Sequence, residues 1–113
     1  MNKLIIDAAN EKIFLMIITN ASIYNITHEN TKINYEKLTI IIDDFLLSKN
    51  LKIADIGVIY INIGLGSFAG IRNSMSVVKA FNVAKNIDYY CYNLHDFKDE
   101  KDLSYENIPN LCK

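Results

Sequence analysis

The chain has 113 residues, a formal net charge of −1 and 50% hydrophobic residues. The length fits one compact domain with its own core, and the apolar content excludes a chain that is disordered throughout. The low net charge and the lack of a basic run argue against a surface that binds nucleic acid by itself. The apolar runs are too short for a membrane span and the N-terminus has no signal-peptide layout. The two widely spaced cysteines, Cys91 and Cys112, are typical of a cytoplasmic protein with reduced thiols.

Three strands joined by short turns are predicted for the N-terminal part of the chain. Residues 4–6 form a short apolar run that ends at Asp7, and residues 13–19 are apolar and partly β-branched. Residues 22–27 alternate apolar and polar side chains. The short connections favour an antiparallel meander. We expect Asp7 to have a turn or capping role.

The hydrophobic period then changes from that of a strand to that of a helix. Asn34 is the predicted N-cap of this first helix and Asn50 its predicted stop. The apolar stripe that indicates the helix consists of Leu38, Ile41, Ile42, Phe45 and Leu46.

The rest of the chain predicts a strand, a long helix and a last strand. Residues 56–63 are an apolar run typical of a strand buried on both faces, residues 68–85 a helix, and residues 88–93 a strand. The order is βββαβαβ, and the right-handed crossover rule makes the fourth strand parallel to the first. We therefore predict an α/β domain over residues 1–97, with a five-stranded mixed sheet and two main helices on one face. Residues 98–113 form a charged C-terminal tail.

A glycine-rich turn, GLGSFAGIR at residues 64–72, joins the fourth strand to the second helix. It matches the dinucleotide pattern G-x-G-x-x-A in letters, but it follows the wrong strand and no acid closes the next strand. Gly64 and Gly66 favour a tight turn, Gly70 a close approach of the helix to the sheet, and Ser67 an N-cap. The backbone N–H groups of this helix start remain a candidate anion site.

Arg72 is the only arginine in the chain and stands in the first turn of the second helix, where the helix dipole favours acids. It is either a surface residue whose stem covers apolar area or a contact to a carboxylate or phosphate. His28 and His95 are isolated, so the sequence predicts neither a zinc site nor a nucleophile–base pair. We predict no catalytic residue, no metal and no cofactor.

The two helices carry more apolar surface than one sheet face needs. On the first, Ile40 and Leu47 lie opposite the core stripe. The second has one patch around Met75 and Val78 and another around Phe81. Either the surplus packs helix against helix inside the domain, or it forms a protein interface, which we favour. The predicted interface residues are Glu36, Ile40, Asp43, Leu47, Arg72, Met75 and Lys79.

These features resemble the N-terminal half of the TsaB family, also called YeaZ, over roughly residues 4–97. The resemblance rests on the first strand ending in Asp7, the meander, the helix bearing Asn34-Tyr35-Glu36, and the turn at residues 64–72, which is similar to the family's GPGSFTGLR. It implies an actin/Hsp70-like (ASKHA) fold of the ribonuclease H-like type. It also implies a non-catalytic role in making the threonylcarbamoyladenosine of tRNA.

Family members support TsaD, a paralogue that holds metal and nucleotide, and work with the ATPase TsaE. Their contact with TsaD uses the two helices of the N-terminal domain in a four-helix arrangement. The tRNA is met only through the complex. The resemblance thus implies a TsaD-like partner and, beside it, a TsaE-like ATPase.

The sequence departs from the family at several positions. Leu65 replaces the motif proline, Ala69 the threonine, Asn34 the histidine of the first helix, and Ala8 the threonine after the first strand. A second domain has no counterpart here, and the ASKHA nucleotide cleft lies between two domains. We expect the tail or another copy of the chain to cover the surface that the second domain would share. Two alternatives stay open: a degenerate kinase- or peptidase-like ASKHA fragment with nucleotide affinity at the glycine turn, and a homodimeric scaffold.

Overall fold

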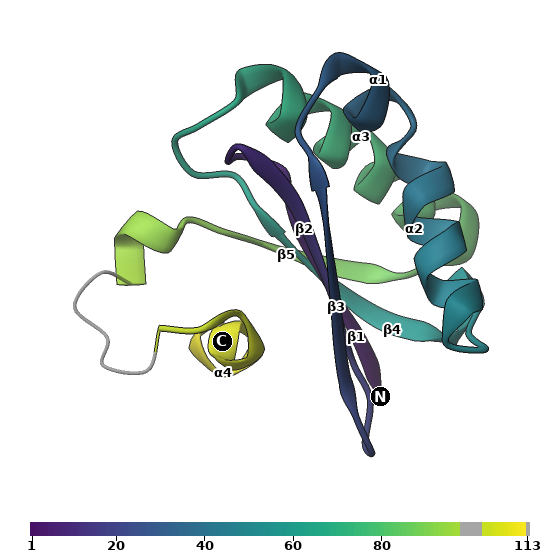
Figure 1. The fold of residues 1–113 in the computed structure, drawn as a ribbon. Helices are drawn as coiled ribbons and strands as arrows, with labels where there is room; N and C mark the ends of the chain where they lie inside the picture. Colours follow the sequence, from purple (N-terminus) through teal and green to yellow (C-terminus); the bar gives the residue numbers. More distant parts are fainter. Residues whose placement is uncertain (98–102, 113) are drawn as a thin grey trace.

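The computed structural model describes residues 1–97 and 103–112 and has a mixed five-stranded sheet at its centre (Figure 1). The strand order is β3-β2-β1-β4-β5. The fold is the predicted α/β arrangement, with β1, β2 and β3 in an antiparallel meander and β4 parallel to both β1 and β5. The strands are β1 (Asn2–Asp7), β2 (Lys12–Ile18), β3 (Ile23–Glu29), β4 (Ile56–Asn62) and β5 (Asp88–Tyr92).

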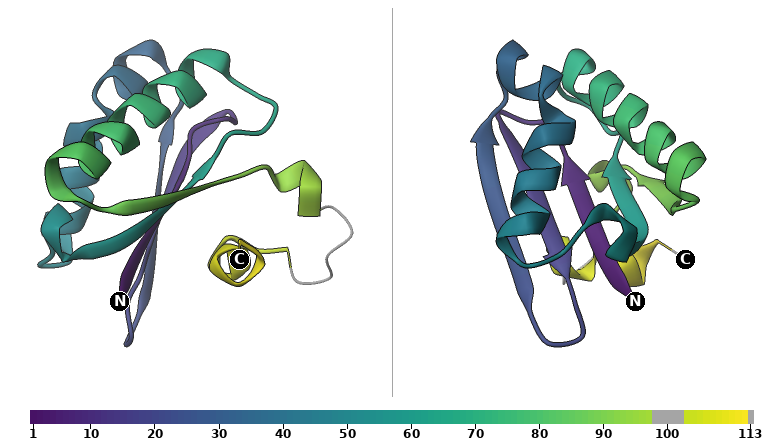
Figure 2. Two further views of the ribbon diagram at one scale, coloured as in Figure 1. Left: turned by 180° about the vertical axis from the view of Figure 1, so that it is seen from behind. Right: turned by 90° about the vertical axis from the view of Figure 1, so that its right-hand side faces the viewer.

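Three α-helices cover one face of the sheet, and the short C-terminal elements lie on the other face (Figures 1 and 2). The long helices α2 and α3 lie side by side over the sheet, as predicted. The α-helices are α1 (Lys32–Glu36), α2 (Leu38–Ser48), α3 (Phe68–Lys85) and α4 (Ile108–Leu111). Short 3-10 turns are η1 (Ile53–Asp55), η2 (Leu94–Phe97) and η3 (Tyr105–Asn107).

The first predicted helix is divided in two, and its predicted N-cap is wrong. The side chain of Thr31 caps α1 by accepting from the backbone N–H of Asn34, 3.3 Å away. Asn34 itself lies inside α1 and donates from Nδ2 to the carbonyl oxygen of Glu29 at 2.8 Å. Asn50 follows α2 with a φ of 59°, the left-handed conformation that ends a helix, so the predicted stop is confirmed.

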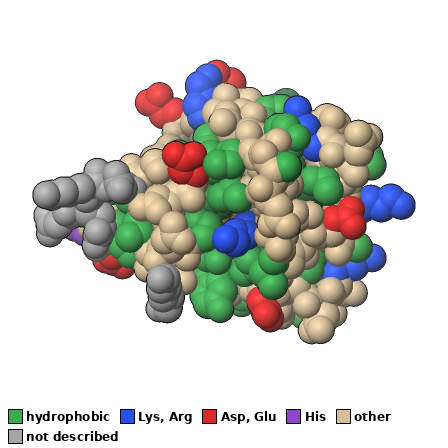
Figure 3. Space-filling model, turned by 90° about the horizontal axis from the view of Figure 1, so that it is seen from below, with side chains coloured by type: hydrophobic (Ala, Val, Ile, Leu, Met, Phe, Trp, Pro, Cys, Tyr) green, Lys and Arg blue, Asp and Glu red, His purple; other side chains and the backbone are tan. Residues whose placement is uncertain are grey.

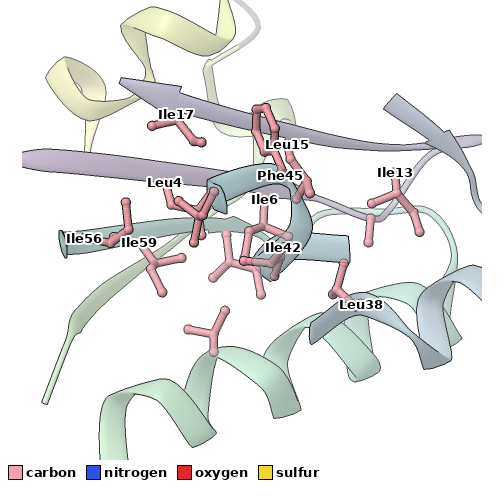
Figure 4. Packing of buried hydrophobic residues seen from close by; sticks show 14 of the residues in the cluster. Leu4, Ile6, Ile13, Leu15, Ile17, Leu38, Ile42, Phe45, Ile56 and Ile59 are labelled. Carbon is pink, nitrogen blue, oxygen red and sulfur yellow. The ribbon is translucent and has the colours of Figure 1, made fainter. Parts of the chain in front are cut away.

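The main core lies between the sheet and α2 and α3, and it is aliphatic. Side chains from β1 and β2 point at those of α2 (Figure 4). These side chains include Leu4, Ile6, Ile13, Leu15, Leu38, Ile42 and Phe45, all buried. Alternate residues of a strand point to opposite faces, so the residues between them on β1 and β2 build the second face.

The second face of the sheet has a smaller core that the C-terminal segment covers. Its buried members are Ile5, Met16, Val58, Tyr60, Tyr92 and Ile108. Ile108 of α4 is completely buried, and Tyr105 of η3 stacks on Phe14 with ring centroids 3.9 Å apart. Residues 103–112 therefore pack on the sheet as a cover.

Hydrophobic side chains also reach the surface. Figure 3 shows them across the middle of the face seen from below, with charged side chains scattered around. None of the helices within residues 1–97 and 103–112 is both long and apolar enough to pass through a membrane.

Candidate partner interface and glycine turn

The outer face of α2 carries two exposed aliphatic side chains. Ile40 and Leu47 are each 58% exposed, and they stand opposite the buried residues Leu38 and Ile42. They are seven residues apart, so they lie on the same side of the helix. Asp43, between them in sequence, is exposed as well. This face is an apolar stripe with an acidic residue, as the sequence predicted.

The outer face of α3 is polar at the positions that the sequence singled out. Arg72 and Lys79 are exposed and share one side of the helix with Ser76. The guanidinium of Arg72 lies over the ring of Phe68, 5.6 Å from its centroid. The charged group of Arg72 therefore covers part of an aromatic ring, and both side chains remain exposed.

The predicted interface residues are distributed over three helices, α1, α2 and α3. Glu36 lies on α1, beside α2, and Met75 lies on the flank of α3 that faces β5. The sulfur of Met75 is 3.9 Å from that of Cys91, and its side chain packs against the core. Val78 is fully buried. The apolar surplus of α3 is therefore smaller than the sequence suggested, because most of it belongs to the core.

The glycine turn begins α3 and rests on the turn between β1 and β2. Ser67 caps the helix by accepting from the backbone N–H of Gly70 at 3.1 Å, as predicted. Its own N–H donates to the carbonyl oxygen of Ala9 at 2.7 Å. Gly66 has a φ of 155°, and a Cβ there would stand 2.0 Å from the same oxygen. Only glycine fits this position.

Gly70 brings the first turn of α3 equally close to the β1–β2 turn. A Cβ on it would lie 2.1 Å from the carbonyl oxygen of Ala8. Asn30 ties the same region together by donating from Nδ2 to the carbonyl oxygens of Ala8 and Asn10, at 2.7 and 2.6 Å. The turn therefore uses its glycines for close packing. The N–H of Ser67, which a phosphate cradle would use as a donor, is already bound to the carbonyl oxygen of Ala9.

Gly64 has a different neighbour. Its N–H donates to the side chain of Asn62 at 2.9 Å, and a Cβ would stand 2.4 Å from Oδ1 of Asn93. Beyond it, Leu65 is 91% exposed and Phe68 76% exposed. The sequence predicted Leu65 and Phe68 only as positions of the glycine-turn motif, and their exposure was not predicted. The exposure of these residues could have been predicted from their place in a turn, on either side of the N-cap Ser67.

Asp7 is a fully buried carboxylate at the end of β1, and it acts in the β1–β2 turn as expected. It accepts from the backbone N–H of Ala9 at 3.0 Å and from the side chain of Asn10. The hydroxyl of Tyr105, from the C-terminal segment, donates to it at 2.6 Å. No sequence pattern indicated this last contact, because it joins residues 98 positions apart.

The tyrosines near Asp7 are held in their neutral form. Burial, then the hydrogen bond to Asp7, raises the pKa of Tyr105 well above its ordinary value. Burial also raises the pKa of Tyr92, and the charge of Asp7 adds to the effect. Within the described part of the chain, the Tyr92 hydroxyl has no hydrogen-bond partner. The described residues contain no group of three His, Cys, Asp or Glu side chains placed to hold a metal ion.

Comparison with known proteins shows which solved structures share this fold. No protein-family model matches the sequence, and no curated protein does. Among solved structures, YeaZ from Pseudomonas aeruginosa superposes with a TM-score of 0.74 at 14% identity. A second structure, described as an uncharacterized protein with similarity to peptidase YEAZ from Pseudomonas aeruginosa, gives the same values. In both cases 88% of this chain and 49% of the other are covered.

The chain thus spans about half the length of the solved structures that it matches. At this identity the likeness establishes the fold, and it agrees with the resemblance seen in the sequence. The protein has a YeaZ-like α/β fold, corresponding to one half of those proteins.

Proposed function

We propose that this chain is a TsaB-like, non-catalytic subunit that binds a TsaD-like protein through the outer faces of α2 and α3. In this role it supports threonylcarbamoyladenosine modification of tRNA in the cytoplasm and meets the tRNA only through its partner. The proposal joins the YeaZ-like fold to the resemblance in the sequence, and the exposed stripe on α2 carries it.

The stripe supports a helix-to-helix contact. Ile40 and Leu47 keep more than half of their surface exposed on a helix whose opposite side is already buried. Such a pair, one heptad apart, packs well between the helices of a partner. Arg72 and Lys79 on the neighbouring helix α3 add charges that fit acidic side chains at the rim of the contact.

The glycine turn supports a non-catalytic role. Gly66 and Gly70 pack on the carbonyl oxygens of Ala9 and Ala8, so the turn faces acceptors that repel a phosphate. The buried carboxylate of Asp7 is already engaged by Ala9, Asn10 and Tyr105. The Ser67 N–H and the Asp7 carboxylate are thus already used in contacts within the chain, which favours a role without nucleotide chemistry.

The test is co-purification with a co-expressed TsaD-like protein from the same source. Leu47→Asp places a charge in the stripe, and we expect it to lower the affinity about tenfold or more, because an apolar anchor is lost in a desolvated contact. Ile23→Asp is the matched control: Ile23 is 46% exposed at the start of β3, away from the helices. It should leave binding unchanged.

Equal recovery of the partner by the wild type and Leu47→Asp would contradict the interface. Calorimetry with ATP tests the other half of the proposal, since binding in the micromolar range would favour the degenerate-enzyme alternative. A TsaE-like ATPase included in the same experiment would show whether it joins through the partner.

A further inference from the structure

We propose that β5 pairs with β5 of a second copy of this chain, so that two sheets join into one across a two-fold axis. This interaction uses the edge of the sheet and not the helix face, and it is independent of the function proposed above.

β5 is an edge strand, and among the described residues its outer side has no backbone hydrogen-bond partner. Among the described strands it pairs with β4 alone. The carbonyl oxygen of Tyr92 accepts from Ile63 N–H at 2.8 Å, which fixes the direction of the backbone groups. Because these groups alternate along a strand, the backbone N–H and C=O groups of Asp88, Tyr90 and Tyr92 point toward β4. The N–H and C=O groups of Tyr89 and Cys91 therefore point away from the sheet.

These two residues stand symmetrically about Tyr90. In an antiparallel pair centred on Tyr90, Tyr89 of one copy faces Cys91 of the other, and each such pair exchanges both of its N–H···O bonds. All the outward backbone groups of the strand are then satisfied. No like charges meet, because the single charged residue, Asp88, stands opposite Tyr92 of the second copy.

The strand has few of the features that protect edges. It contains no lysine and no proline, and no bulge interrupts its register with β4. Cys91 is exposed and Tyr90 is 49% exposed, so the described residues leave room for a second chain at this edge.

The surface beside Tyr90 also fits a second copy. Tyr90 lies between two hollows, one of about 280 Å³ toward Phe97 and Leu111, and one of about 170 Å³ toward Met1 and Tyr60. The two-fold axis brings the second Tyr90 to the same face of the sheet, between these hollows. Tyr90 already stacks on Tyr60 with centroids 5.6 Å apart, so the pairing extends an existing aromatic cluster.

Disulfide trapping tests the register. In a background of Cys91→Ser and Cys112→Ser, Tyr90→Cys places two thiols on the axis. Their Cα atoms are then about 4.5 Å apart, within the range that a disulfide spans. Asp88→Cys is the matched control on the same strand, because the two copies of residue 88 lie about 13 Å apart in this register. Under mild oxidation Tyr90→Cys should form covalent dimers about tenfold faster or more, owing to the high effective concentration in the dimer.

Sedimentation of the full chain provides the second measurement. The wild type should sediment as a dimer. Cys91→Pro removes an outward N–H and none of the hydrogen bonds to β4, and it should sediment as a folded monomer. Cys91→Ala keeps the N–H and should remain dimeric, which excludes a disulfide at Cys91 as the cause. A monomeric wild type, or equal cross-linking rates at positions 88 and 90, would overturn the proposal. Either result would instead favour the hypothesis that the edge of β5 binds an extended peptide of another protein.

Discussion

The two faces of the sheet are closed in different ways. On one face, α2 and α3 cover a core of aliphatic side chains such as Leu4, Ile42 and Ile59, with the helices close to the strands in sequence. On the other face, a short segment at the end of the chain covers a smaller core rich in tyrosine. A buried carboxylate, Asp7, lies at the end of β1 and is bound by Tyr105 of this segment.

From this difference we expect the C-terminal cover to open separately from the rest of the fold. The helix face contributes most of the buried apolar area and defines the architecture, so its loss unfolds the chain. The C-terminal cover is held by the burial of Ile108, by the packing of Leu111 and Cys112, and by Tyr105, which stacks on Phe14 and donates to Asp7. Regions held by few contacts open at a lower free energy than the core. Substitutions on each face can test this comparison.

Ile42→Ala should have the largest effect. Ile42 is fully buried between α2 and the sheet, and its truncation leaves a cavity in a region that cannot open separately. We expect the free energy of unfolding to fall by about 3 kcal/mol, measured by urea denaturation. A loss below about 1 kcal/mol would mean that the helix face is as loosely held as the C-terminal cover.

Ile108→Ala should cost less, although Ile108 is equally buried. We expect residues 103–112 to leave the sheet as a unit, which limits the loss to the free energy with which they dock. We expect about 2 kcal/mol. A chain that ends at Phe97 provides the limit, since Ile108→Ala must not destabilise more than that truncation does. If it did, the tail and the main core would unfold as one unit and the comparison would fail.

Tyr105→Phe isolates the polar part of the tail contact. It keeps the ring stacked on Phe14 and removes the O–H that donates to Asp7, which retains Ala9 and Asn10 as donors. We expect a loss of about 1.5 kcal/mol, the usual scale for a hydrogen bond to a charged group. Urea denaturation of both proteins at neutral pH measures it.

The pH dependence gives this substitution a second readout. The pKa of Tyr105 is raised in the folded chain from its ordinary value of 10.0. Above pH 10 the unfolded chain releases this proton while the folded chain keeps it, so stability falls as the pH rises. Tyr105→Phe should fall less steeply over this alkaline range. Tyr92, whose pKa is also raised, keeps part of the slope in both proteins. Identical slopes would show that the Tyr105 hydroxyl is not engaged.

Sequence reasoning succeeded where the pattern is local. The alternation of apolar residues, the glycine turn and the helical stripe predicted the five strands, the parallel pairing of β1 with β4, and helix α3 with Ser67 as its cap. Each of these depends on neighbours in sequence or on a general rule of chain topology. The exposed positions of Ile40 and Leu47 followed from the same periodicity.

Reasoning failed where distant or competing contacts decide. Asn34 and Thr31 both suit an N-cap, and the structure uses Thr31 because Asn34 is drawn to the carbonyl oxygen of Glu29. The width of the apolar surface on α3 could not show that Val78 and Met75 face the sheet and β5. The contact between Tyr105 and Asp7 has no local signature at all.

The smallest effect is expected on the outer face of α2, and it completes the comparison. Ile40→Gln and Leu47→Gln change side chains that are 58% exposed, and glutamine is a good helix former, so neither substitution creates a cavity or breaks the helix. Each should change the free energy of unfolding by less than about 0.5 kcal/mol. Leu47 is as apolar as Ile42 and lies on the same helix, so a near-zero cost beside the large cost of Ile42→Ala would show that α2 has a second apolar side that folding does not need. A cost above about 1 kcal/mol at either position would instead assign the stripe to stability and remove the main support for a partner interface.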